Sequence, residues 1–145
     1  MKQVHILLVE DNEGDIVLTR DALEEGKISN SLFVVRDGEE ALEYLEKRGR
    51  YRDAENPHLI LLDINLPKMN GHEVLVKIKQ NPELKHIPVI MLTTSSSESD
   101  VMQAYRNYSN CYITKPVDVE TFLNLVSSIE TFWISIVELP RDGAS

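Results

Sequence analysis

The sequence contains little cysteine and little positive charge, and it has no long apolar run. Its 145 residues include one cysteine, Cys111, so no disulfide can form within the chain. The net charge of −9 argues against a general surface for nucleic acid or for anionic membranes. No run reaches the length of a membrane span, and the apolar stretch after Lys2 ends at Glu10, so we expect no signal peptide. A reducing cytoplasm is the simplest expected compartment.

The composition is that of an ordinary globular domain. Hydrophobic residues make up 42% and charged residues 27%, and the chain is long enough for one domain with a proper core. We expect that domain to span residues 1–139, with its core at 4–129 and a C-terminal helical extension at 118–139. A tail at 140–145 would follow, which leaves no room for a DNA-binding domain.

Short apolar runs alternate with segments of helical periodicity along the whole chain. The predicted strands are Val4–Val9, Leu32–Val35, Leu59–Leu62, Pro88–Leu92 and Cys111–Thr114. The predicted helices lie at 13–25, from 38 onward, and at 71–79, 99–107 and 118–138. This alternation predicts an α/β fold, a flavodoxin-like (βα)5 doubly wound parallel sheet in the order 2-1-3-4-5 with an extended C-terminal helix.

The stretch around Asp63 organises the rest of the chain. Leu59–Leu62 has no polar face, which is typical of a strand buried on both sides in a parallel sheet. The run stops at Asp63, and Asn65, Pro67 and Gly71 then supply turn chemistry. A lone aspartate after a strand is usually a turn or N-cap residue, so Asp63 alone would not indicate a site.

Three other strand ends carry polar residues that strengthen the case for a site. Glu10 and Asp11 follow the first strand, Thr93 follows the fourth and Lys115 follows the fifth. In a doubly wound sheet these ends share one edge, where ligands bind. Crowded carboxylates repel one another, and Mg²⁺ is the cation that suits carboxylate oxygens. Metal, lysine and hydroxyl together would receive a phosphoryl group, with Asp63 as the nucleophile.

The motif Asp63-Ile-Asn-Leu-Pro-Lys-Met-Asn-Gly71 resembles the phosphoacceptor motif of response-regulator receiver domains. These domains belong to two-component signalling, and the chain is similar to their single-domain, chemotaxis-regulator type from Val4 to about Ile129. Two positions depart from the commoner motif, because Leu66 stands where Met is usual and Asn70 where Asp is usual.

The resemblance implies a role for each residue of the set. Asp63 would accept a phosphoryl group from a sensor histidine kinase. Mg²⁺ would be held by Asp11, by Asp63, by the backbone carbonyl of Asn65 and, through water, by Glu10. The chain would then be a signalling switch with self-phosphotransfer and slow autodephosphorylation, not a classical enzyme.

Further positions match the part of the family motif that responds to phosphorylation. Thr93 would bond a phosphoryl oxygen, Lys115 would pair with the phosphate, and the Lys115–Pro116 peptide would be cis. Tyr112 matches the aromatic switch position, although it could be a simple strand aromatic. Thr94 departs from the Ala or Gly common after the switch hydroxyl, which leaves the dephosphorylation rate open.

Three stretches resemble the small regulators that are paired with bacterial phytochromes. They are the segment Asn110-Cys-Tyr-Ile-Thr-Lys115, the basic connector within Glu46–Pro57, and Glu130-Thr-Phe-Trp-Ile near the end. A phytochrome-type kinase is therefore the expected partner. We interpret the connector as a solvated loop, and contact with an acidic partner is the alternative.

Three other functions remain open on the sequence alone. A flavin mononucleotide module of the same fold would need a phosphate-binding loop where Glu10 and Asp11 stand. An aspartate-nucleophile phosphatase of the haloacid-dehalogenase type would need a second aspartate where Asn65 stands. A degenerate receiver that only binds partners would not need the intact acidic set.

The final helix predicts a homodimer. A stripe from Val119 through Phe122 and Val126 suits packing on the sheet, and further apolar residues beside it widen the arc to about twice what such a helix needs. These additional residues are Leu125, Phe132, Ile136 and Leu139. The helix would also overhang a small domain, so a two-fold pair of final helices would cover the exposed end.

Overall fold

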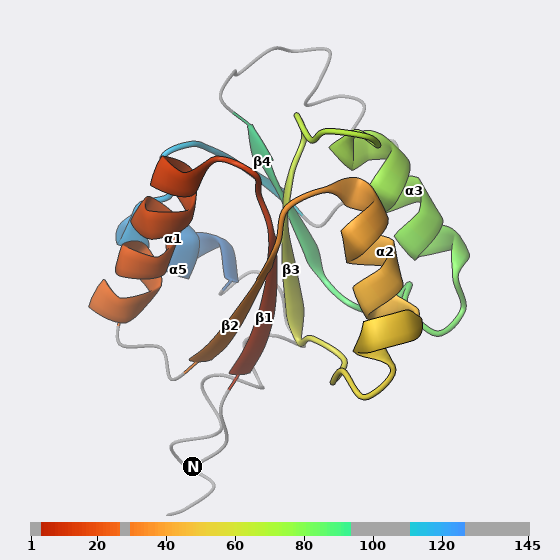
Figure 1. Cartoon of the computed structure of the whole chain (residues 1–145). Helices are drawn as coiled ribbons and strands as arrows, with labels where there is room; N and C mark the ends of the chain where they lie inside the picture. The colour runs from red at the N-terminus through yellow and green to blue at the C-terminus, as the bar shows by residue number, and fades with distance from the viewer. Residues whose placement is uncertain (1–3, 27–29, 94–110, 127–145) are drawn as a thin grey trace, which may run out of the picture.

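A five-stranded parallel sheet with the order β2-β1-β3-β4-β5 forms the centre of the protein (Figure 1). The computed structural model describes residues 4–26, 30–93 and 111–126. The strands are β1 (Val4–Val9), β2 (Asn30–Val35), β3 (Leu59–Asp63), β4 (Val89–Thr93) and β5 (Cys111–Thr114). The predicted fold class and strand order are confirmed, with β2 beginning two residues earlier than expected.

In the described part of the chain, four α-helices cover the two faces of the sheet. They are α1 (Glu13–Glu25) and α5 (Val119–Val126) on one face, and α2 (Gly38–Leu45) and α3 (Gly71–Gln80) on the other (Figure 1). Within the described residues, no helix is long and apolar enough to cross a membrane. The predicted helix at 99–107 and the part of the final helix beyond residue 126 lie outside the described residues.

Polar side chains define where these helices begin. The side chains of Asn12, Asp37 and Asn70 each accept a hydrogen bond from the backbone N–H three residues later. Asp118 does the same for Thr121 ahead of α5. Each of the first three caps directly follows a strand end or its loop, so the caps fix how the chain turns from the sheet into the helices.

The apolar residues divide into two cores, one on each face of the sheet. Alternate residues of β1 and β3 enter each core: Ile6 and Leu61 lie beneath α1 and α5, whereas Leu7 and Leu62 lie beneath α2 and α3. All five residues of β3 are buried. The prediction that this strand is covered on both sides is therefore confirmed.

The basic connector is packed against the domain and is not a simple solvated loop. It contains a short 3-10 helix, Gly49–Tyr51, whose Tyr51 packs edge-on against Phe33 of β2 and Tyr44 of α2. The carboxylate of Glu40 accepts bonds from Tyr51 and Arg50 and so ties the connector to α2. The interpretation as a solvated loop holds for the arginine side chains but is wrong for Tyr51.

Gly71 allows the start of α3 to approach the end of β3 closely. A Cβ atom at this position would lie 2.2 Å from the carbonyl oxygen of Asp63 and 2.7 Å from the Cα of Ile64. The Gly71 N–H also donates to the Ile64 carbonyl at 2.8 Å. The loop that follows Asp63 is thus held against the helix by a contact that only glycine permits.

We predict that Gly71→Ala lowers the free energy of unfolding by at least about 2 kcal/mol, because the added methyl group clashes with backbone atoms that cannot move freely. Urea denaturation measures the change. Gly14→Ala is the matched control, since its Cβ would meet only the Asn12 side chain, at 3.3 Å. In a helical position this control is expected to be neutral or slightly stabilising. Equal stability of the two variants would contradict the assigned role of Gly71.

Candidate functional site

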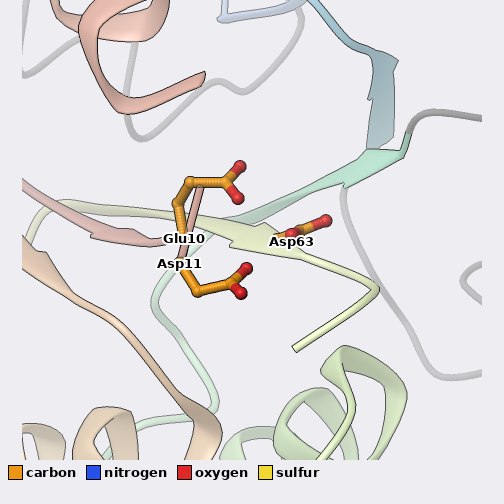
Figure 2. Close-up of side chains that lie close together, drawn as sticks. All are labelled: Glu10, Asp11 and Asp63. Atoms are coloured by element: carbon orange, nitrogen blue, oxygen red, sulfur yellow. The ribbon is translucent and has the colours of Figure 1, made fainter. Parts of the chain in front are cut away.

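Three carboxylates gather at the carboxyl edge of the sheet. Glu10 and Asp11 follow β1, and Asp63 is the last residue of β3 (Figure 2). One oxygen from each side chain can be chosen so that all three lie within 4.8 Å of one another. Glu10 is 0% and Asp63 2% exposed, while Asp11 lies open to solvent. The structure therefore brings together the acidic set that the strand ends predicted.

The strand register explains this meeting of residues. Val9 of β1 lies beside Leu62 of β3, so Glu10 and Asp63 each occupy the next position along neighbouring strands. The Glu10 N–H also donates to the Val35 carbonyl at 3.0 Å, which extends the pairing of β1 with β2 past the end of the strand. The sheet itself thus holds the two buried carboxylates.

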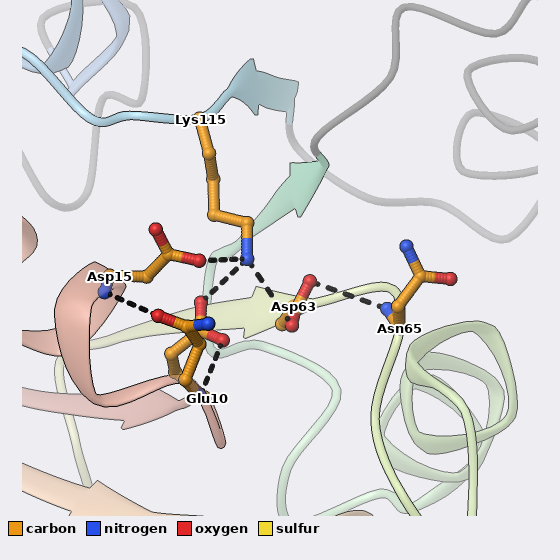
Figure 3. A network of polar contacts seen from close by, with 6 residues as sticks. Glu10, Asp15, Asp63, Asn65 and Lys115 are labelled. Carbon is orange, nitrogen blue, oxygen red and sulfur yellow. Dashed lines mark hydrogen bonds and ion pairs between the residues drawn. The ribbon is translucent and has the colours of Figure 1, made fainter.

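Lys115 reaches into the acidic cluster from the end of β5. Its Nζ lies 2.9 Å from Glu10 Oε1, 2.9 Å from Asp15 Oδ2 and 3.4 Å from Asp63 Oδ2 (Figure 3). The Lys115 side chain is 6% exposed, so these ion pairs are largely shielded from water. Three carboxylates thus contact one ammonium group and Asp11 lies near two of them, so the cluster keeps an excess of negative charge.

Burial and this excess charge change the acidity of Asp63. Burial is the largest cause that raises the pKa of Asp63, to about 7, and the charge of Glu10 raises it further. Lys115 and the Asn65 N–H, which donates to Asp63 Oδ1 at 3.3 Å, act in the opposite direction. Burial lowers the pKa of Lys115, but hydrogen bonds to Asp15 and Glu10 outweigh that effect and raise it overall.

The predicted switch residues lie next to this cluster. Thr93 is buried at the end of β4 and pairs in register with Thr114, and its carbonyl accepts a 2.7 Å bond from the Lys115 N–H. The Lys115–Pro116 peptide is cis, as expected. Tyr112 is half-buried in β5 and packs against the core beneath α2 and α3. Thr94, which departs from the common motif, lies outside the described residues.

Asp15 is the site residue that the sequence analysis missed. It lies in the first turn of α1, where acidic residues are common because they complement the helix dipole, so its presence there carried no signal. The fold brings the first turn of α1 beside the residue that follows β5, exactly one hundred positions further along the chain. Only this long-range contact distinguishes Asp15 from the other acids of α1.

The donor set fits a hard divalent cation. Carboxylate oxygens are the ligands that Mg²⁺ and related ions prefer, and Asp11 keeps one side of the cluster open to water. Burial is the main cause of the raised pKa of Asp63, and the charge of Glu10 adds to it, so the cluster holds negative charge that a cation would balance. Asn65 is exposed and its side chain points away from Asp63 (Figure 3), so its side-chain amide adds nothing to this set.

Comparisons with known proteins agree with this arrangement. The response regulator receiver domain family matches residues 6–127. Response regulator Rcp1 from Synechocystis is 47% identical over 135 residues, which are 93% of this chain and 92% of that protein.

Two solved structures extend the likeness to three dimensions. The Mn²⁺-bound form of Rcp1 gives a TM-score of 0.75 at 46% identity and covers 90% of this chain and 94% of that chain. The phosphorylated cyanobacterial phytochrome response regulator RcpA gives 0.78 at 46% identity and covers 92% of this chain and 96% of that chain. Because the matches extend over nearly the whole sequence, the chain belongs to the response-regulator receiver family of two-component signalling proteins, and it is similar to the regulators of phytochromes.

Proposed function

We propose that the protein is a phosphorylation-dependent switch in which Asp63 accepts a phosphoryl group from a sensor histidine kinase. The observation that carries this proposal is the buried Asp63 carboxylate, held at a strand end between a lysine and two further carboxylates. An Asp63 oxygen would form a bond to phosphorus while the bond between phosphorus and the kinase histidine nitrogen breaks. The likeness to a phosphorylated phytochrome regulator supports this chemistry and favours a phytochrome-type kinase as the donor.

The cluster residues would hold Mg²⁺ for this reaction. Asp11 and Asp63 would bind it directly, the Asn65 carbonyl would add a ligand, and Glu10 would act through water. When bound, the ion would neutralise the charge that develops on the transferred phosphoryl group. The existence of an Mn²⁺-bound form of Rcp1 supports binding of a divalent cation.

The residues of β4 and β5 would respond to the new charge on Asp63. The Thr93 hydroxyl would bond a phosphoryl oxygen, Lys115 would pair with another, and Tyr112 would follow the movement of Thr93. The same pocket would support self-phosphotransfer from small phosphodonors and slow autodephosphorylation. We place this switch in the cytoplasm, without direct nucleic-acid or membrane binding, in keeping with its acidic composition.

We predict that acetyl phosphate and Mg²⁺ label Asp63, because it combines burial, a neighbouring lysine and a carboxylate-rich metal pocket. Mass spectrometry of the modified protein locates the adduct, and Asp63→Asn is expected to lose it. Asp37→Asn is the matched control, since Asp37 also follows a strand and caps a helix but lies outside the cluster. Labelling of Asp63→Asn equal to wild type would refute the assignment.

We predict that the metal-free protein loses stability as pH rises from about 4 to about 7. Asp63 has a folded pKa near 7, above its ordinary value of 3.8, so the folded state binds this proton more tightly than the unfolded state. Deprotonation in that range therefore favours unfolding. Asp63→Asn should lack this part of the pH dependence and be more stable than wild type at pH 8, where Lys115 still has Glu10 and Asp15 as partners.

Thermal melts at several pH values, with and without Mg²⁺, measure these differences. Mg²⁺ should restore the stability of wild type at pH 8 by binding the native state. Asp11→Ala, which removes an exposed ligand, should lose most of the Mg²⁺ shift. A full shift in Asp11→Ala would contradict the metal assignment, and an unchanged pH profile in Asp63→Asn would contradict the raised pKa.

We also propose that the protein forms a homodimer through its final helix. The described part of that helix, α5, buries Phe122 in the core, as the stripe from Val119 predicted. Of the apolar residues assigned to the dimer contact, Phe132, Ile136 and Leu139 lie beyond residue 126, outside the described residues. Sedimentation is expected to show a dimer at tens of micromolar, roughly an ordinary weak-dimer range, that Phe132→Glu dissociates, and a monomeric wild type would end the proposal.

A further inference from the structure

The Lys115 ammonium group lies closer to Glu10 and Asp15 than to Asp63. An ammonium group has three hydrogens to donate. Two of them serve the hydrogen bonds to Glu10 and Asp15, both at 2.9 Å, whereas the distance to Asp63 is 3.4 Å (Figure 3). The ammonium group is therefore held closer to the α1 side of the pocket than to the carboxylate that would accept phosphate.

The backbone around Asp15 is fixed independently of Lys115. The Asp15 N–H donates to the side chain of Asn12 at 2.9 Å, in the N-cap of α1, and the next residue, Ile16, is buried in the core. The Asp15 side chain is 24% exposed, so it stands at the rim between solvent and the buried carboxylates. Its carboxylate is thus presented to Lys115 from a rigid helix end.

We propose that Asp15 is a positioning residue that keeps Lys115 back from Asp63, so that Asp63 stays available to the cation and to the phosphoryl donor. This inference rests on the function proposed above for Asp63. Asp15 contacts the Lys115 ammonium group, and it would act on the acceptor carboxylate through this lysine.

Electrostatics gives the reason why the lysine would move without Asp15. Two carboxylates, Glu10 and Asp63, would remain for an ammonium group that has little access to water. The long lysine side chain would then shift toward Asp63 and form a closer ion pair with it. That pair would compete with the cation for the same oxygens and would make the carboxylate a poorer nucleophile.

Asp15→Asn in the full-length chain tests the proposal, with the Mg²⁺ dissociation constant measured by calorimetry. We expect the constant to rise about tenfold, the usual scale for loss of a residue that orients a metal ligand. Glu13→Gln is the matched control, because Glu13 lies in the same helical turn and carries the same charge but pairs with Arg36 on the surface. It is expected to bind Mg²⁺ as wild type does.

A double-mutant cycle with Lys115→Ala separates positioning from a simple effect of charge. If Asp15 acts through the lysine, Asp15→Asn in the Lys115→Ala background should change the Mg²⁺ dissociation constant by less than about twofold. Asp15→Glu keeps the charge and should remain close to wild type, which guards against a variant that merely fails to fold. Thermal melts of each variant report whether the fold is intact.

Two outcomes would overturn the inference. Wild-type affinity in Asp15→Asn would show that Asp15 does not influence the site, and equal losses with and without Lys115 would show that it acts by charge alone. The labelling of Asp63 by acetyl phosphate is a separate measurement. If wild type carries no phosphoryl group on Asp63, the proposed function fails even where the Mg²⁺ affinities behave as expected.

Discussion

Buried negative charge at one edge of the sheet is the constraint on which the rest of the site depends. Glu10 and Asp63 are buried at adjacent strand ends. In the described part of the chain, Lys115 is the cation that forms ion pairs with both. Removing carboxylates from water is costly unless they are paired and hydrogen-bonded. One lysine faces several carboxylates, so the cluster is short of positive charge, and the charge of Glu10 adds to the effect of burial in raising the pKa of Asp63. A divalent cation would supply the missing positive charge, and a phosphoryl group on Asp63 would add negative charge that the cation and Lys115 would then balance.

The packing around the cluster turns this electrostatic constraint into a geometric one. β3 is buried on both faces and cannot slide without disturbing two cores, so Asp63 is delivered at a fixed depth. Gly71 allows the loop that follows Asp63 to pack closely against α3. Gly38 allows the start of α2 to approach the same loop, because a Cβ atom on Gly38 would lie 2.5 Å from the Met69 carbonyl oxygen. The acceptor loop is therefore enclosed by two helix starts while Asp11 and Asn65 remain at the surface.

Most of the fold and the acidic set follow from local pattern. Apolar runs that stop at a charged or hydroxyl residue located β1, β3, β4 and β5 to within one residue. The pattern is clearest in β3 and β4, which are fully buried and have no polar position before their last residue. Asp63, Glu10 and Lys115 were found because strand ends of a parallel sheet share an edge. Asp15 could not be found this way, because its partner, Lys115, follows the distant strand β5. An acidic residue in the first turn also stabilises any helix, so the position of Asp15 indicates no site. Tyr51 was missed for a similar reason: the charged residues around it hide a single aromatic that packs on β2 and α2.

The positions of Thr93, Tyr112 and Lys115 explain how a charge placed on Asp63 would reach the far side of the sheet. Asp63 pairs in register with Leu92, so the next residue of β4, Thr93, lies beside the acceptor, and its carbonyl is bonded to the Lys115 N–H. Tyr112 lies three residues before that lysine on β5 and pairs with Met91, in the core beneath α2 and α3. A new anion at Asp63 would act on the lysine side chain and the threonine hydroxyl, which are joined to each other through the backbone. Because packed strands resist gradual deformation, the two residues would respond together and not independently.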